Sequence, residues 1–426
     1  GITAVVGELN ALDIGSTAVG TAVASKAVIL DSNKDYTGIR NLTISGELDA
    51  ATLDVSGNVD VDGVLETDNL TIGGAQGTDG QVLTSTGSGV GWEDVASGVS
   101  SINDLSDGTS NITNFANSIL ISNDGGTGTL DAASNNTGLG FEAFDDLTSG
   151  DDNTAIGFKA LTVLTTGSNN TGIGARALLS NTTGGANTAI GENALYQNTT
   201  ANFNTAVGYQ SLDANTEGAS NTGIGADALS ANTTGAENVA LGKGALGANT
   251  TASYNVAVGQ GAGDAITTGN YNVAIGRSAL TTLTTNAANT AVGGTALSAN
   301  TAANNTAVGY ASLAANTTAT NNTAVGYSSL AANTTGANNS ALGSLSLDAN
   351  TTGGANTAIG KQALTTNTTG SFNTAVGTGS LALATTASNN TAVGYDSLVA
   401  NTTGTSNVAV GGAAGDAITT GSYNTA

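Results

Sequence analysis

The chain has 426 residues, and its 32 acidic side chains outnumber its 8 basic ones to give a formal net charge of −24. This excess of negative charge disfavours nucleic acid and anionic membrane surfaces as partners. The sequence contains no Cys and no His, which excludes disulfide and thiolate chemistry and removes the most common general base and transition-metal ligand.

The sequence has no apolar run of membrane-spanning length, so we expect no membrane insertion. It also has no Met, and it stops at Ala426 within an N-T-A triplet of a repeat. We therefore expect this sequence to be an interior piece of a longer polypeptide.

The front of the chain divides into two segments. Residues 1–41 form an N-terminal segment of alanine-rich and aliphatic stretches, whose pattern fits short strands or a helix. Residues 42–74 repeat an apolar-x-apolar-x-Gly pattern, which is typical of short strands and tight turns with one buried face. Strands of about five residues cannot bury a core in one chain, so this segment is predicted to be a β-shaft built from several chains. Its strands are LTISG (42–46), LDVSG (53–57), VDVDG (59–63) and LTIGG (70–74).

Residues 75–130 are predicted to be a β-rich connector that also caps the segment after it. They include the only tryptophan of the chain, Trp92, which we interpret as an anchor packed at a junction. A cap is expected because the first unit of a repeat array otherwise leaves an open strand edge.

A repeat of seventeen residues fills residues 131–426. All intervals between the leading Asn residues are seventeen, except for the sixteen between Asn289 and Asn305. The consensus is N-T-A-[VIL]-G-x-x-[AS]-L-x-x-N-T-T-G-x-x, and repeat positions are numbered here from the leading Asn. The copies start at residues 136, 153, 170, 187, 204, 221, 238, 255, 272, 289, 305, 322, 339, 356, 373, 390, 407 and 424.

Each copy is too short to bury its own core, so it is predicted to be one coil of a β-solenoid that shares hydrogen bonds and side-chain ladders with its neighbours. The N-T-A-V-G stretch alternates as a half-buried strand does, and the Gly at position 5 suits a positive φ or a close backbone approach. The N-T-T-G stretch supplies turn chemistry. Positions 6 to 10 fit either a bend or one helical turn.

Two copies exchange an apolar side chain between two positions. Gly263 and Gly415 replace Leu at position 9, while Ile266 and Ile418 replace Asn at position 12. This exchange indicates that position 12 faces inward, where its Asn would form an amide ladder along the stack. The alternative is an Asn that only caps a turn. The residues expected in the structural ladders include Val207, Gly208, Leu212, Ile224, Leu229, Val325, Leu330 and Asn333.

Each coil offers about two aliphatic side chains for burial, at positions 4 and 9. So thin a core, rich in Ala and Gly and almost free of aromatic residues, suits three chains packed closely about one axis. We predict an all-β fold, an elongated homotrimeric fibre in which the β-shaft is followed by a β-solenoid, or β-roll, of 17-residue coils.

Position 6 varies most and is predicted to face outward. It holds Tyr209, Tyr310, Tyr327 and Tyr395. Tyr310 and Tyr327 lie on adjacent coils, about 4.8 Å apart along the axis, and predict a small stacking platform for a glycan or another receptor group. The alternative is a scatter of surface tyrosines on a structural rod.

The residue pattern contains no catalytic constellation, and we expect neither enzyme activity nor a cofactor. The carboxylate pairs Asp145/Asp146 and Asp151/Asp152 fit a calcium site with nearby Asn oxygens, but solvated turns are the preferred interpretation.

The string SNNTAVGYDSLVANTTGTSN (388–407) and its relatives resemble repeats of phage tail-fibre proteins. ELNALDIG (8–15) and GQVLTSTGSGVGWED (80–94) are similar to tail-fibre shaft sequence. A weaker resemblance links strands such as NVAVG (255–259) to the heads of trimeric autotransporter adhesins, whose repeats are shorter. The first resemblance implies a homotrimeric fibre that reaches from a virion to a host surface.

We therefore predict a structural virion fibre that projects a receptor-binding tip and mediates host-cell attachment. Its expected partners are two further copies of the chain, a host-surface glycan or protein, and other tail proteins bound through a part that precedes Gly1. The expected location is extracellular, on a virion tail or a cell surface. The alternatives are a bacterial trimeric surface adhesin or surface filament and, less favoured, an ice-binding solenoid, since Val replaces Thr at position 2 in several copies.

Overall fold

The computed structural model describes residues 47–48, 52–62, 70–72, 75–78, 81–85, 90–94, 108–112, 115–121 and 132–426. The chain forms two compact units, Gly1–Glu93 and Asp94–Ala426. The N-terminal segment 1–41 and the predicted strand at 42–46 lie outside the described residues. No helix occurs among the described residues, and the prediction of an all-β chain with a β-solenoid is confirmed.

The first unit contains two small two-stranded sheets, of which the first is antiparallel. Strands β1 (Thr71–Ile72) and β2 (Ala75–Gln76) form one, and β3 (Gln81–Ser85) and β4 (Val90–Asp94), which reaches one residue past the unit's end, form the other. The Trp92 ring lies against Gly77, where an added Cβ would approach two ring carbons within 2.6 Å. Trp92 therefore packs on the backbone of its own unit.

Residues 52–62 contain no strand, although two were predicted there. Leu53, Val55, Val59 and Val61 are exposed, with 70% of Leu53 accessible to solvent. The alternating pattern is present, but a single chain offers this apolar face nothing to pack on, so hydrogen-bonded strands do not form within it.

The second unit begins with a hairpin that leads into the solenoid. Strands β5 (Gly108–Ile112) and β6 (Phe115–Ile121) are antiparallel, and β6 then pairs in parallel with β7 (Ala133–Ser134) and β8 (Thr137–Leu139). The β6 strand therefore occupies the edge of the first coil, where the cap was expected. Leu120 of β6 is buried against the first coil, near Gly138 and Phe144.

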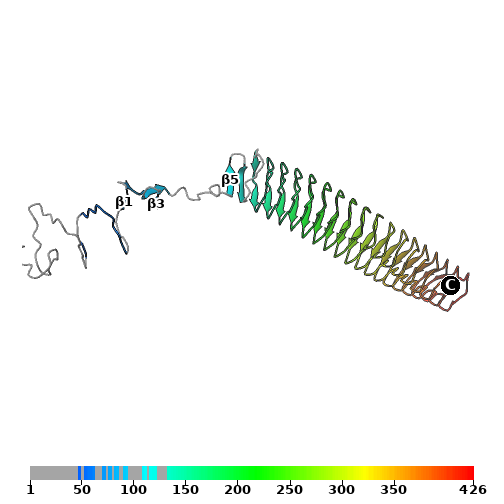
Figure 1. Ribbon diagram of the computed structural model, residues 1–426. Helices are drawn as coiled ribbons and strands as arrows, with labels where there is room; N and C mark the ends of the chain where they lie inside the picture. Colours follow the sequence, from blue (N-terminus) through cyan, green and yellow to red (C-terminus); the bar gives the residue numbers. More distant parts are fainter. Residues whose placement is uncertain are drawn as a thin grey trace, which may run out of the picture. The chain divides into compact units, whose positions relative to one another are not determined.

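From β8 onward every coil adds one three-residue strand, made by repeat positions 2 to 4, to a single parallel sheet (Figure 1). Neighbouring strands pair in register, so that Thr205 lies beside Thr222 and Ala206 beside Gly223. The sixteen steps from β8 to β24 span roughly 77 Å at about 4.8 Å each. The later strands are β9 Thr154–Ile156, β10 Thr171–Ile173, β11 Thr188–Ile190, β12 Thr205–Val207, β13 Thr222–Ile224, β14 Val239–Leu241, β15 Val256–Val258, β16 Val273–Ile275, β17 Thr290–Val292, β18 Thr306–Val308, β19 Thr323–Val325, β20 Ser340–Leu342, β21 Thr357–Ile359, β22 Thr374–Val376, β23 Thr391–Val393 and β24 Val408–Val410.

The interior of the solenoid is built from small residues, Asn and, in most coils, one leucine at position 9. Position 3, represented by Ala206, and position 9, represented by Leu212, Leu229 and Leu330, are fully buried. Leu212 has a φ of 54°, a left-handed conformation that is unfavourable for a residue with a Cβ. Burial of its side chain offsets that strain. Positions 6 to 10 are therefore a tight turn and not a helical turn.

The expectation that position 4 adds to the core is wrong. Val207 and Val325 are half-buried, and Ile224 is 37% exposed. Side chains alternate between the two faces of a strand, so the inward Asn and Ala at positions 1 and 3 send positions 2 and 4 outward. Position 3 is Ala or Gly in every coil, and a Cβ on Gly172 would already stand 3.3 Å from the Leu161 side chain, so this wall leaves no room for a larger residue.

Two ladders of Asn side chains run through the interior. At position 1, Asn221 donates its backbone N–H to Asn204 Oδ1 (2.9 Å) and its Nδ2 to the Gly235 carbonyl (2.8 Å). At position 12, Asn232 donates Nδ2 to Asn215 Oδ1 (2.7 Å) and to the same Gly235 carbonyl (2.9 Å). Asn333 takes part in the second ladder in the same way. The two ladders thus converge on position 15 and join the corners of each coil.

The position-1 ladder is continuous, whereas the position-12 ladder is interrupted. Position 1 bonds run from Asn136 to Asn424, even across the sixteen-residue coil, where Asn305 N donates to Asn289 Oδ1 (3.1 Å). This coil is one residue shorter in the turn after position 12, where Asn300 Nδ2 donates to the Ala302 carbonyl. At position 12, the buried Oδ1 atoms of Asn249, Asn367 and Asn401 have no partner. The next coil offers Ile266, Ala384 or Ile418 at that place.

The paired exchange fills the same interior space in another way. The Ile266 Cδ1 lies 3.0 Å from the point where a Cβ on Gly263 would stand, and Ile266 is fully buried. The isoleucine therefore occupies the room that a position-9 leucine fills in other coils.

Every position-5 glycine adopts a φ between 129° and 144°. A Cβ on Gly208 would stand 2.6 Å from the carbonyl carbon of Gly225 in the next coil. We expect Gly208→Ala to lower the free energy of unfolding by about 2 kcal/mol or more, through backbone strain and this clash. Gly294→Ala, at position 6 inside the stack, is the control, since it has no left-handed φ and its Cβ would meet nothing closer than the Tyr310 ring at 3.4 Å. Urea unfolding followed by circular dichroism measures both, and equal midpoints would contradict this account.

The gap at Ala384 predicts a stabilising substitution. Ala384→Asn would give Asn367 Oδ1 the donor that it lacks and would join Asn401 to the ladder, so we expect a gain of about 1 kcal/mol. Ile266→Asn, at the equivalent position of a coil with Gly at position 9, leaves a cavity and is expected to destabilise. Urea unfolding followed by circular dichroism measures both variants, and the free energy of unfolding is expected to rise in Ala384→Asn and to fall in Ile266→Asn. A loss of stability in Ala384→Asn would contradict a stabilising role for the position-12 ladder.

Candidate functional surfaces

The four tyrosines predicted as receptor contacts all lie on the outer surface. Tyr209, Tyr310, Tyr327 and Tyr395 are between 49% and 65% exposed. The structure brings only Tyr310 and Tyr327 together, because Tyr209 and Tyr395 have no aromatic residue at position 6 of the adjacent coils.

Tyr310 and Tyr327 stack along the solenoid. Their ring centroids are 6.0 Å apart and the ring planes differ by 12°. Two carbons of the Tyr310 ring lie 3.4 and 3.6 Å from the point where a Cβ on Gly294 would stand. The glycine at position 6 of the preceding coil thus leaves room for the ring to lie over the backbone. The pair forms an aromatic platform that spans neighbouring coils.

Tyr395 has a polar neighbour of its own. A hydrogen bond to the Asp396 carboxylate, and secondly the negative charge of that group, raise the pKa of Tyr395 above its ordinary value. A tyrosine is neutral at physiological pH even without this shift, so the phenol keeps its O–H donor.

A second aromatic column, at position 17, was missed in the sequence. Tyr254 and Tyr271 stack with centroids 5.0 Å apart and planes within 2°, a closer pair than Tyr310 and Tyr327. The charge of Glu237 on the preceding coil is the largest cause that raises the pKa of Tyr254, followed by Tyr271 and a hydrogen bond to Glu237. The signal is present in the sequence, because Tyr254 and Tyr271 both occupy position 17 of adjacent repeats. Phe203 and Phe372 occupy the same column and are exposed.

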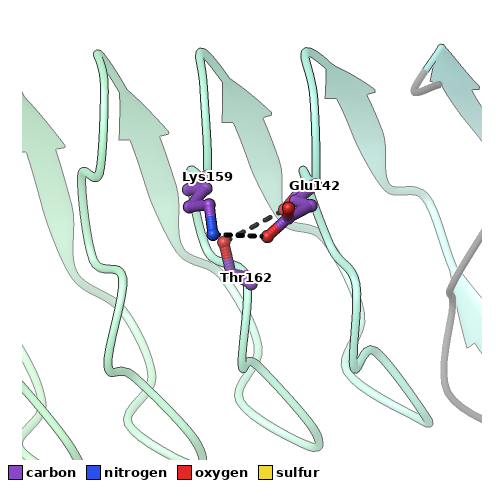
Figure 2. A network of polar contacts seen from close by, with 3 residues as sticks. All are labelled: Glu142, Lys159 and Thr162. Carbon is purple, nitrogen blue, oxygen red and sulfur yellow. Dashed lines mark hydrogen bonds and ion pairs between the residues drawn. The ribbon is translucent and has the colours of Figure 1, made fainter. Parts of the chain in front are cut away.

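The start of the solenoid carries a small network of charged and aromatic side chains. Glu142 and Lys159 form an ion pair of 2.8 Å, and the Thr162 hydroxyl donates to the Glu142 carbonyl at 3.0 Å (Figure 2). Lys159 Nζ also lies 5.5 Å from the centroid of the Phe158 ring, which stacks on Phe141. These contacts join the first coils to one another, and a partly exposed ion pair adds little stability by itself.

Two of the acidic residues considered as calcium ligands, Asp151 and Asp152, accept hydrogen bonds from protein groups. Asp151 Oδ1 accepts the backbone N–H of Ser134 (2.8 Å), and Asp152 Oδ1 accepts Asn135 Nδ2 (3.0 Å). The described residues contain no group of three or more acidic side chains that could hold a metal ion. In the same part of the chain, no helix is long and apolar enough to cross a membrane.

Two further carboxylates are partly shielded from solvent. Burial raises the pKa of Asp213 and of Asp264, both at position 10, above the usual range for Asp. Partial burial of a carboxylate is enough to raise its pKa, so these two pKa values do not indicate a catalytic site.

The surfaces described here offer stacked aromatic rings, hydroxyls and amides, the groups that proteins use to hold sugars. No family model, no curated protein and no solved structure matches the chain.

Proposed function

We propose that this chain is a structural fibre protein that, as a homotrimer, holds a receptor-binding part away from a virion, in the manner of a phage tail fibre. The observation that carries the proposal is the unbroken in-register pairing of seventeen strands from β8 to β24. A stack in which every coil is bonded to the next resists bending and serves as a spacer. Its location would be extracellular.

The aromatic platforms support a second role, in weak contacts with a host-surface glycan or protein along the side of the fibre. The Tyr310/Tyr327 pair and the Tyr254/Tyr271 pair are exposed and lie on different columns of the surface. Three copies of each pair in one fibre would add their weak contacts through multivalency.

The native mass tests the fibre proposal. Three chains of 41.0 kDa give an expected mass of about 123 kDa by light scattering on a sizing column. Negative-stain electron microscopy should show particles with a straight segment. A mass of one chain would contradict the homotrimer and leave a monomeric solenoid.

A glycan array tests the platforms. The Tyr310→Ala/Tyr327→Ala chain is expected to bind its glycans about 3- to 10-fold more weakly, the loss of one or two aromatic contacts. Tyr209→Ala removes an isolated tyrosine and serves as the matched control, and Tyr254→Ala/Tyr271→Ala tests the second column. If all variants bind as the unaltered chain does, the tyrosines are not receptor contacts.

A further inference from the structure

The outer face of the solenoid sheet is an unbroken apolar stripe. Position 4 is Val, Ile or Leu in every strand from β8 to β24, and position 2 is Thr, Val or Ser. Neither column contains a charged residue in any coil. Eight of the seventeen position-4 side chains are exposed, as in Leu241 (45%) and Leu342 (50%), and the other nine are partly buried.

The stripe is most apolar at its centre. In β14, β15 and β16 both outward positions are aliphatic, so that Val239 and Leu241, Val256 and Val258, and Val273 and Ile275 form a patch of six side chains. In most other coils the outward residue at position 2 is Thr. A central apolar cluster within a more polar surround is the usual arrangement of a protein interface.

The exposed area is too large for a surface without a partner. The seventeen position-4 side chains, of which eight are exposed and nine partly buried, together present on the order of 1,000 Å², beyond the few hundred Å² that a monomer usually exposes in one patch. It is also about what one partner buries in a specific, stable interface.

The two edges of the stripe differ in charge. Positions 6 and 7, which follow the strand, hold all five basic residues of the solenoid together with four acidic ones: the basic residues are Lys159, Arg176, Lys243, Arg277 and Lys361, and the acidic residues are Glu142, Glu192, Asp227 and Asp396. Positions 16 and 17, which precede the strand, hold only acidic charges: Asp151, Asp152 and Glu237. Glu237 and Lys243, for example, lie on opposite sides of β14.

These opposite edges favour one arrangement of two identical stripes. When copies are related by rotation about an axis parallel to the solenoid, the basic-containing edge of each faces the acidic edge of the next, and equal coils lie at equal heights. In an antiparallel pair the acidic edges would face each other, which is unfavourable.

We propose that the partner of this stripe is a second copy of the same chain, bound strand face to strand face, parallel and with each coil beside its own equivalent. In the homotrimer proposed above, on which this inference rests, the three stripes would line the common axis. The position-4 side chains, which a single chain leaves outside, then form a second core.

Disulfide cross-linking of the full chain tests the face and the direction, because the chain contains no native Cys. Ile190→Cys and Ile359→Cys place single thiols on the stripe at sites of equal exposure, 39% each. Each variant alone should form covalent dimers on oxidation, with at most about two-thirds of the chains linked, because three equivalent thiols leave one unpaired. Leu383→Cys, 49% exposed but outside the stripe, should remain unlinked.

A co-expressed mixture of Ile190→Cys and size-tagged Ile359→Cys chains distinguishes the two directions. The two sites are ten coils apart, so a parallel assembly gives no mixed dimer. These sites lie in the fourth and the fourteenth of the seventeen strands from β8 to β24, so a centred antiparallel pair brings them together. Mixed dimers would therefore overturn the parallel arrangement.

Charge substitutions give an independent readout. Leu241→Asp/Val258→Asp should lower the native mass from about 123 kDa towards the 41.0 kDa of one chain, while Leu383→Asp keeps it. Circular dichroism of the solenoid checks that both variants fold. Cross-linking of Leu383→Cys but not of Ile190→Cys would overturn the stripe as interface and leave the homotrimer standing. A single-chain mass for the unaltered protein would overturn both, and loss of glycan binding alone would affect only the receptor proposal.

Discussion

The structure depends on the hydrogen bond that one coil makes to the next through the Asn at position 1. Its side-chain oxygen accepts the backbone N–H of the following Asn, as between Asn204 and Asn221, while its Nδ2 donates to a carbonyl across the same coil. Each Asn thus satisfies buried backbone groups that no strand reaches, in two directions at once. A net contribution of about 1 kcal/mol per bond is small, but it recurs in every coil.

This arrangement explains how so thin a core is sufficient. An interior that consists mostly of Ala or Gly, Asn and one large apolar side chain per coil cannot supply much hydrophobic stabilisation, so the chain relies on repeated hydrogen bonds whose partners are brought together by the stacking of the coils. The left-handed backbone conformation of Leu212 is another consequence of the short coil. A turn tight enough to close the coil in seventeen residues needs the unusual φ, and the buried leucine makes it tolerable.

The period of the sequence was enough to predict the solenoid, the special backbone at Gly208 and the inward position of Asn333, because identical spacing places identical residues in contact. It was not enough to predict which strand face points inward. Val207 is apolar and was expected in the core, yet the smaller Ala206 is the residue that points inward. The space inside the coil is set by all of its turns, and the strand sequence alone does not show it. The ladder at position 1 was missed for the same reason. The Asn at position 1 is invariant in the sequence, but whether its side chain points inward depends on which face of the strand lines the interior.

The sixteen-residue coil shows that the stack tolerates a change in one turn without a change in its repeating bonds, since the link from Asn289 to Asn305 is kept. Every junction between coils is chemically almost the same, so removing or duplicating a whole repeat recreates a junction that already exists. Unequal recombination within such a gene would therefore lengthen or shorten the protein in increments of about 4.8 Å without disturbing the packing of the adjacent coils. The reach of the molecule is thereby a quantity that evolution can adjust one coil at a time.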